Sequence, residues 1–299
     1  MGSLSQKEQE GLRAFLKEAL QEDVGDGDVT CSLLFHDSFV VSASLLSKSN
    51  GILAGIEPFL EVFRILDPLC IISGFPEDGS RLTKNMEIGK IEGKVSAILT
   101  GERVALNILS HLSGIATLTS RFVERAQGDF QILDTRKTLP GMRTLEKYAV
   151  RIGGGSNHRR GLDSMIMIKD NHISSWISVY GGSRIEAIPT LVKKANAKKG
   201  SLKVEVEVES LEEALVAWNA GADIIMFDNS SPEIIKKFLA SIGSQQSPII
   251  EASGGITLST VPSFQGSGVN WVSVGALTHS APAFDFSLEI ISSSSSLSV

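Results

Sequence analysis

The feature that most constrains the fold is a repeated alternation of short apolar segments and helical stretches between residues 131 and 275. The last four apolar segments end near Glu207, Asp228, Ser253 and Gly275, at intervals of 21, 25 and 22 residues. Each interval fits one strand followed by one helix, which is the unit that builds parallel sheets. The pattern predicts an α/β barrel, with room for fewer than eight strands. The expected strands are 131–135, 164–169, 203–208, 223–228, 248–253 and 270–275.

The first half of the chain has a different pattern. Apolar residues at helical spacing predict a helix over 6–23. Short apolar runs then follow, separated by Gly, Pro and Asn, and they predict an antiparallel sheet with a helix near 58–66 packed on it. A long helical pattern from 102 to about 126 is expected to join two domains. The expected strands of this sheet include 40–46, 69–72 and 95–99.

Composition narrows the class of protein. The 299 residues are 42% hydrophobic and 21% charged, as in ordinary globular proteins. No apolar run approaches the roughly 20 residues of a membrane span, and the first residues do not resemble a secretory signal. The net charge of −6 argues against a general nucleic-acid binder. We therefore expect a cytoplasmic protein without membrane or nucleic-acid partners. Cys31 and Cys70 are too isolated for a metal or disulfide framework and are expected to be buried thiols.

This acidic chain nevertheless contains one basic stretch, between residues 136 and 169, with only Glu146 and Asp163 opposing it. A solvated helix face and a site for an anionic ligand would both produce such a stretch. Its cations are Arg136, Lys137, Arg143, Lys147, Arg151, Arg159, Arg160 and Lys169.

Position favours the ligand site, because active sites of α/β barrels form at the carboxyl ends of the strands. Nearly every predicted strand end has a charged residue or a glycine. These strand ends are Arg136-Lys137, Lys169, Glu207, Asp228-Asn229, Ser253-Gly254-Gly255 and Gly275-Ala276.

Two further patterns support that interpretation. In 203–209 the strand period of two places Glu205, Glu207 and Glu209 on one face, and this face points into the barrel if the valines meet the helices. An exposed edge strand with a solvated glutamate row is the alternative. Glycine turns at the ends of two late strands suit a phosphate, although plain tight turns would also use glycine.

The sequence neighbours of the five histidines indicate which of them belong to the site. His158 follows a glycine triplet and precedes Arg159, which favours a role in the site. His172 lies close to Lys169, where it would cap or orient the chain. The other three, His36, His111 and His279, have no such neighbours.

These residues form motifs that resemble the quinolinate phosphoribosyltransferase family. The resemblance extends from about Glu22 to the C-terminal tail. It implies an N-terminal α/β sandwich over 1–112, completed by 277–299, and an incomplete barrel of six or seven strands over 113–276. The motifs are Gly101-Glu-Arg-Val-Ala-Leu-Asn, Asp134-Thr-Arg-Lys-Thr-Leu-Pro-Gly, Gly153-Gly-Gly-Ser-Asn-His-Arg, Ile168-Lys-Asp-Asn-His, Lys203-Val-Glu-Val-Glu and Glu251-Ala-Ser-Gly-Gly-Ile.

The resemblance also implies an activity and a site. The activity joins quinolinate to phosphoribosyl pyrophosphate and releases CO2 and pyrophosphate, giving nicotinate mononucleotide. Mg2+ would accompany phosphoribosyl pyrophosphate near Glu207 and Asp228, without assigned protein ligands. A homodimer or a hexamer (a trimer of dimers) would place Arg103 in a neighbouring subunit's site. Substrate-binding residues would be Arg103, Arg136, Lys137, His158, Arg159, Lys169, Glu207, Asp228, Ser253, Gly254, Gly255 and Gly275, and the catalytic ones Lys137, Lys169, Glu207 and Asp228.

Some features depart from this picture or leave other functions open. Arg160 stands where some family members have tyrosine, and Trp176 has no assigned role. A Schiff-base aldolase on the same barrel could use Lys169 or Lys203 as its nucleophile. A non-catalytic sensor of phosphate ligands, or a transferase for another pyridine or pyrrole acid, would also fit the basic stretch.

Overall fold

The computed structural model describes residues 6–36, 38–243 and 246–293, and it forms two compact units. Unit 1 comprises residues 1–120, 139–154 and 280–299. Unit 2 comprises residues 121–138 and 155–279. The predicted domain limits, at 112/113 and 276/277, stay predictions. No helix in the described residues is long and apolar enough to cross a membrane.

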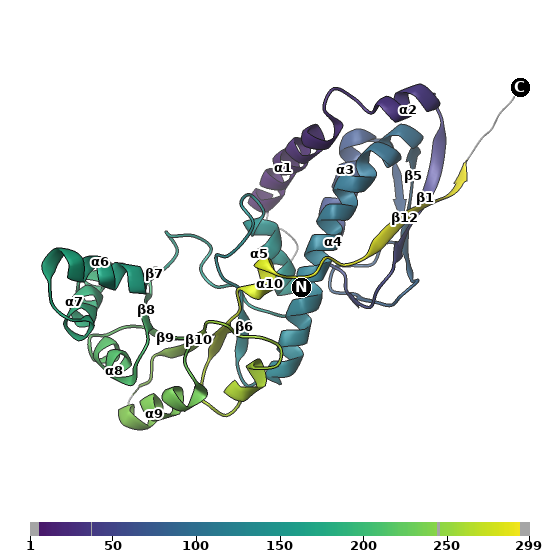
Figure 1. The fold of residues 1–299 in the computed structure, drawn as a ribbon. Helices are drawn as coiled ribbons and strands as arrows, with labels where there is room; N and C mark the ends of the chain where they lie inside the picture. Colours follow the sequence, from purple (N-terminus) through teal and green to yellow (C-terminus); the bar gives the residue numbers. More distant parts are fainter. Residues whose placement is uncertain (1–5, 37, 244–245, 294–299) are drawn as a thin grey trace, which may run out of the picture. The chain divides into compact units, whose positions relative to one another are not determined.

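Unit 1 is built around an antiparallel sheet with the strand order β12-β1-β5-β3 (Figure 1). The predicted antiparallel sheet is thus confirmed. Its edge strand β12 comes from the C-terminal segment and pairs with β1 along most of its length. The strands are β1 (Val40–Ser47), β3 (Ile71–Ser73), β5 (Glu87–Lys94) and β12 (Phe286–Ser293), and β2 (Gly51–Ile52) pairs separately with β4 (Arg81–Leu82).

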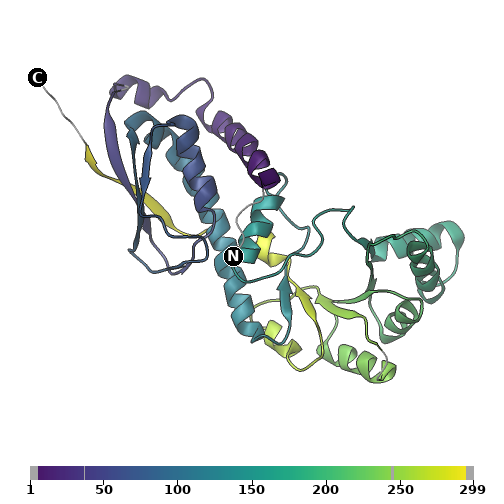
Figure 2. The same ribbon diagram turned by 180° about the vertical axis from the view of Figure 1, so that it is seen from behind.

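Helices α3 and α4 lie along this sheet, as the view from behind also shows (Figure 2). The core between them is apolar, and the rings of Phe59 and Phe63 meet edge to face at 5.2 Å between centroids. The helices of unit 1 are α1 (Gln6–Val24), α2 (Val29–Leu34), α3 (Ile56–Leu66), α5 (Arg143–Ile152) and most of α4 (Val95–Ala126).

The prediction of a strand over 95–99 is wrong, because these residues form the first turn of α4. A short apolar run cannot distinguish a buried strand from a buried helix. Val95 and Ile98, three positions apart, are both buried, which is the helical spacing. The strand that does occur here, β5, ends directly before them, and its buried Ile88 and Ile91 stand among charged residues and glycines.

Unit 2 contains the predicted parallel sheet, and all six expected strands are present. Their order is β6-β11-β10-β9-β8-β7, every neighbouring pair is parallel, and no ladder in the described residues joins β6 to β7. The sheet is therefore an incomplete barrel of six strands. They are β6 (Gln131–Leu133), β7 (Ile166–Ile168), β8 (Val204–Val208), β9 (Ile224–Asp228), β10 (Ile249–Ser253) and β11 (Trp271–Ser273).

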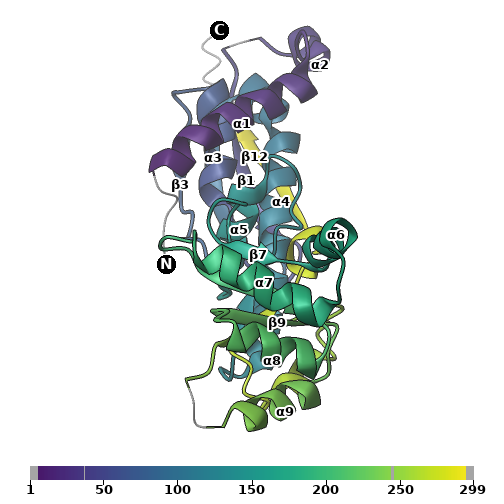
Figure 3. The ribbon, with the colours of Figure 1, turned by 90° about the vertical axis from the view of Figure 1, so that its left-hand side faces the viewer.

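Successive helices of unit 2 pack side by side along the outside of this sheet (Figure 3). The valines of β8, at 204, 206 and 208, are fully buried, as predicted for side chains facing helices. Phe227 of β9 meets Phe238 of α9 at 5.7 Å between centroids. The helices are α6 (Asp170–Tyr180), α7 (Arg184–Asn196), α8 (Leu211–Asn219), α9 (Pro232–Ile242) and α10 (Ala276–His279).

Candidate active site

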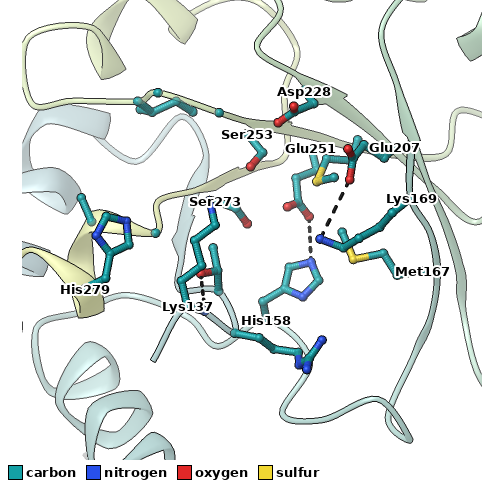
Figure 4. A pocket seen from close by; sticks show the side chains of 18 of the residues that line it. Lys137, His158, Met167, Lys169, Glu207, Asp228, Glu251, Ser253, Ser273 and His279 are labelled. Atoms are coloured by element: carbon teal, nitrogen blue, oxygen red, sulfur yellow. Dashed lines mark hydrogen bonds and ion pairs between the residues drawn. The ribbon is translucent and has the colours of Figure 1, made fainter. Parts of the chain in front are cut away.

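The carboxyl ends of the six strands surround a pocket of about 620 Å³ that lies wholly within unit 2 (Figure 4). This volume suits a small ligand. The lining residues are Thr135, Arg136, Lys137, His158, Arg159, Met167, Lys169, Glu207, Met226, Asp228, Glu251, Ser253, Gly254, Gly255, Ile256, Thr257, Ser273, Gly275, Ala276 and His279.

Four cations of the basic stretch meet in this pocket: Arg136, Lys137, Arg159 and Lys169. Burial and the nearby charge of Arg136 both lower the pKa of Arg159. The buried Nε of Arg136 meets no hydrogen-bond acceptor among the described residues. A buried guanidinium donor without an acceptor is costly, and an anionic ligand would relieve that cost.

A buried aspartate fixes the loop that presents two of the pocket residues. The carboxylate of Asp134, directly after β6, accepts the backbone N–H of His158 at 2.9 Å and the side-chain amide of Asn157 at 2.6 Å. The guanidinium of Arg159 in turn donates to the carbonyl of Met165 at 3.1 Å. These bonds hold His158 and Arg159 at the pocket wall before any ligand binds.

Two carboxylates face the cations from the neighbouring strands β8 and β9. Burial raises the pKa of Glu207, and the ammonium of Lys169, with Nζ 3.9 Å from Glu207 Oε2, acts against that rise. Asp228 accepts a hydrogen bond of 2.7 Å from the side chain of Asn229. The pocket thus has an acidic side as well as a basic one, and Figure 4 shows Glu207 and Asp228 on neighbouring strands.

The glycines at the late strand ends are required by the local geometry. Gly254 and Gly255 both have left-handed backbones, with φ of +90° and +58°. A Cβ at Gly254 would lie only 2.4 Å from Oδ1 of Asn229. At Gly275 a Cβ would lie 3.0 Å from Cδ of Lys137. A side chain at Gly254 would collide with Asn229, and one at Gly275 would crowd Lys137, so glycine leaves the backbone of these turns uncovered.

At the wall of the pocket lies a buried cluster of three ionisable side chains, two of which line the pocket. His158 Nε2 is 3.3 Å from Glu205 Oε2 and 3.2 Å from Glu251 Oε2. Burial acts against a charged imidazole, but the hydrogen bonds and charges of the two glutamates outweigh it and raise the pKa of His158 to about 10. Burial and the charge of Glu251 raise the pKa of Glu205. These three groups lie close enough together to share a metal ion or protons.

The structure shows which of the residues predicted from the sequence line the pocket. The pocket brings together every predicted site residue except Arg103, which is exposed on α4 in unit 1. The basic stretch is divided, because Arg143, Lys147 and Arg151 belong to helix α5 of unit 1. These three cations, which were not among the predicted site residues, do not line the pocket.

Four smaller expectations have clear outcomes. Glu205 and Glu207 point to the sheet interior as expected, whereas Glu209 lies beyond the end of β8, is exposed and pairs with Arg184. His172 does orient the chain, because its Nδ1 accepts the backbone N–H of Lys169 at 2.9 Å. Cys31 is buried, but Cys70 is only partly buried.

Among the pocket residues that sequence reasoning did not predict, three matter for the chemistry of the site. His279 was given no role, yet it lines the pocket from α10 beside Gly275. Ser273 ends β11 two residues before the expected strand end and has a buried hydroxyl without a hydrogen-bond partner among the described residues. Glu251 was quoted only within a motif. Its position two residues before Ser253, on the same face of β10, was the signal that could have found it.

A parallel sheet whose strand ends surround cations, carboxylates and glycine turns defines an α/β-barrel enzyme of anionic substrates. Family models sharpen this class. Residues 28–113 match the N-terminal domain of quinolinate phosphoribosyl transferase, and residues 115–289 match its C-terminal domain. The chain therefore belongs to the quinolinate phosphoribosyltransferase family.

Known proteins agree with this assignment. The chain is 43% identical, over 96% of both chains, to the probable nicotinate-nucleotide pyrophosphorylase [carboxylating] of Bacillus subtilis. It is 41% identical to the human nicotinate-nucleotide pyrophosphorylase [carboxylating], over 83% of this chain and 82% of the human one. Among solved structures, NadC from Streptococcus pyogenes superposes with a TM-score of 0.88 at 40% identity, covering 98% of this chain and 99% of the other.

Proposed function

We propose that the pocket of unit 2 transfers the phosphoribosyl group of phosphoribosyl pyrophosphate to quinolinate, with loss of CO2, and yields nicotinate mononucleotide and pyrophosphate. The observation that supports this most is the meeting of four cations, two carboxylates and a glycine-lined turn in one pocket. The pyridine dicarboxylate and the phosphates need the cations, the ribose hydroxyls need the carboxylates, and the 5-phosphate needs the exposed backbone N–H groups.

Quinolinate binds on the side where Arg136, His158, Arg159 and Lys169 line the pocket. The planar fork of an arginine donates two parallel hydrogen bonds to a carboxylate, so the unsatisfied Nε of Arg136 suits this ligand. Fixing both carboxylates of the pyridine ring orients its nitrogen toward the ribose. Orientation of two bound reactants is a large part of the catalytic effect expected in a two-substrate transfer.

The ribose and phosphates occupy the side formed by β9, β10 and β11. Glu207 and Asp228 hold the ribose hydroxyls and stabilise the positive charge that develops on the ring as pyrophosphate leaves. Ser253, Gly254, Gly255 and Gly275 bind the 5-phosphate. Mg2+ enters with the pyrophosphate as part of the substrate and lies near Glu207 and Asp228, since carboxylate oxygens suit this hard cation.

Lys137 and Lys169 act as catalytic cations. Lys137 neutralises the leaving pyrophosphate, and Lys169, 3.9 Å from Glu207, links the acidic and basic sides of the pocket. The pyridine nitrogen then bonds to the ribose C1. Its positive charge accepts the electrons released when the adjacent carboxyl group leaves as CO2. The protein positions groups and stabilises charge, and no covalent intermediate with the enzyme is needed.

Arg103 completes the site of a neighbouring subunit. It is exposed on α4 and belongs to unit 1, outside the residues that line the pocket of its own chain. A homodimer, alone or as part of a hexamer, would bring this cation to a second copy of the pocket. We place the enzyme in the cytoplasm on the composition of the chain.

The reaction is tested by giving the purified protein quinolinate, phosphoribosyl pyrophosphate and Mg2+, with nicotinate in a parallel assay. We expect equal amounts of CO2 and pyrophosphate with quinolinate and neither product with nicotinate. Turnover of nicotinate instead would overturn the substrate, and failure with both acids would favour a sensor or an aldolase. Borohydride trapping of a carbonyl substrate on Lys169 or Lys203 would identify the aldolase.

A further inference from the structure

The proposed reaction contains a proton transfer that the two arginines of the site cannot perform. When the carboxyl group next to the pyridine nitrogen leaves as CO2, the electron pair of the broken C–C bond stays on the ring carbon. That carbon must then gain one proton to give nicotinate mononucleotide. Arginine is effectively never deprotonated in proteins, so Arg136 and Arg159 bind the substrate but do not donate protons to it.

The buried cluster of His158, Glu205 and Glu251 has the properties of a proton store. His158 Nε2 lies between the two carboxylates, at 3.3 and 3.2 Å. Both oxygens of each glutamate are buried and lack a well-directed hydrogen bond among the described residues. The backbone N–H of Arg159 donates to His158 Nδ1 at 2.8 Å, so in the neutral form of the ring the proton lies on Nε2, facing the carboxylates.

Counting protons shows what the cluster can donate. A neutral imidazole with one ionised and one protonated glutamate contains the same two protons as an imidazolium with two ionised glutamates. Both arrangements have a net charge of −1, and two ionised glutamates beside a neutral ring would place −2 in a buried site. The cluster therefore retains one proton more than three isolated side chains would at neutral pH.

The cluster borders the pocket on one side only. Glu251 and His158 are lining residues, whereas Glu205 lies behind them and is fully buried. Figure 4 shows the carboxylate of Glu251 between the histidine ring and the side chains of Ser253 and Glu207. A proton on Glu251 thus has access to the pocket and is shielded from bulk water.

We propose that Glu251 donates the proton that replaces the departing carboxyl group, and that His158 and Glu205 keep this proton in the cluster until the C–C bond breaks. The C–C electron pair takes the proton from Glu251 and forms the new C–H bond. Glu251 is left ionised, and water restores its proton through the pocket after product leaves. This inference rests on the proposed function.

The test is a single turnover of Glu251→Gln in which pyrophosphate and CO2 are measured separately. Glutamine keeps the size of the side chain but has no acidic proton. We expect pyrophosphate release within about threefold of the native enzyme, and CO2 release slowed by about 10²-fold or more, the usual loss when a general acid is removed. The mononucleotide that still has both carboxyl groups should accumulate.

A matched control separates this role from a structural one. Glu213 is also buried in unit 2, but it pairs with Arg184 on the outer helices, at 2.6 Å, and does not line the pocket. Glu213→Gln should weaken folding while CO2 and pyrophosphate still appear together. If Glu251→Gln does not fold, Glu251→Asp, which keeps the acid but withdraws it by one methylene, should still delay CO2 behind pyrophosphate.

Three results would overturn the proposal. CO2 and pyrophosphate slowed equally in both Glu251 variants would make Glu251 structural. One equivalent of a transition metal in the native protein, lost in Glu205→Gln, would make the cluster a metal site. Native enzyme that releases both products while Glu251→Gln matches it would leave the proposed function intact and refute the proton donor. Native enzyme that releases neither product would instead refute the proposed function.

Discussion

A histidine contacts buried glutamate in both units of the molecule, but the carboxylate oxygens are fully hydrogen-bonded in one unit and not in the other. In unit 1, His111 Nε2 lies 2.8 Å from Glu146 Oε1, and the second oxygen of Glu146 accepts the backbone N–H of Leu139 at 3.2 Å. In unit 2, His158 lies between two carboxylates at longer distances, and four carboxylate oxygens lack well-directed hydrogen bonds among the described residues.

The difference indicates what each pair is for. A buried carboxylate with a partner at each oxygen has reached its best arrangement, and ligand binding would gain nothing from it. The cluster in unit 2 and the Nε of Arg136 are instead left incomplete beside a pocket. Buried polar groups without hydrogen-bond partners cost stability, and proteins keep them where a bound ligand or a proton transfer supplies the missing partner. The comparison predicts that unit 1 variants lose stability and pocket variants lose activity.

The largest effect is expected from Arg136→Ala. Loss of a guanidinium that binds a carboxylate should cost about 2 to 5 kcal/mol, or roughly 30-fold to several thousand-fold in kcat/KM for quinolinate. The free energy of unfolding should change little, because the Nε removed has no partner among the described residues. Steady-state kinetics and chemical denaturation on the same preparation would measure both.

Arg125→Ala is the matched control for this variant. Arg125 is an exposed arginine in the last turn of α4 and lies outside the pocket. Its loss should leave kcat/KM within about twofold, as is usual for an exposed position. Near-native activity of Arg136→Ala would refute the role of Arg136 in binding quinolinate. It would also refute the expectation that pocket variants lose activity rather than stability.

The sequence predicted the site residues at the strand ends, but not which unit contains the helix within the basic stretch. The period of two in β8 and the regular strand spacing place Glu207, Asp228 and the glycine turns correctly, because strand ends of a parallel sheet meet at one edge. The helix α5 could not be assigned in this way. It interrupts the basic stretch and belongs to unit 1, and linear proximity to Arg136 says nothing about which core buries it.

The buried cluster illustrates a second limit. His158, Glu205 and Glu251 come from a loop and from two strands that are not adjacent in the sheet. Their meeting depends on how a loop folds over the open side of the barrel, which local periodicity does not encode. The family motifs include all three residues, but only the fold brings them together.

A smaller effect is expected from His111→Ala, which tests the unit 1 side of the comparison. Removing the imidazole takes from buried Glu146 a hydrogen bond to a charged group, worth about 1.5 to 3 kcal/mol. The loss should appear in the free energy of unfolding of unit 1, followed by far-UV circular dichroism. Tryptophan fluorescence serves as the internal control, since Trp176, Trp218 and Trp271 all lie in unit 2. A transition lowered equally by both probes would mean that the units unfold together.

The effect that is smallest per pH unit concerns the pH dependence of unit 2. The pKa of His158 is about 10 in the folded protein against an ordinary 6.5, because the carboxylates of Glu205 and Glu251 outweigh the effect of burial. A pKa that is higher when folded gives stability that is complete below pH 6.5 and is lost as pH rises toward 10. The raised pKa of Glu205 acts in the same direction.

Urea unfolding followed by tryptophan fluorescence between pH 6.5 and 10 would measure this slope. One released proton limits the slope to about 1.4 kcal/mol per pH unit. Trp271 is a local reporter, since its ring lies 6.5 Å from that of His158. Glu251→Gln removes one of the two carboxylates that hold the proton, so its slope should be shallower than that of the native protein. An unchanged slope would show that the cluster does not retain a proton on folding. The cluster would then differ from the His111–Glu146 pair of unit 1 only in its geometry.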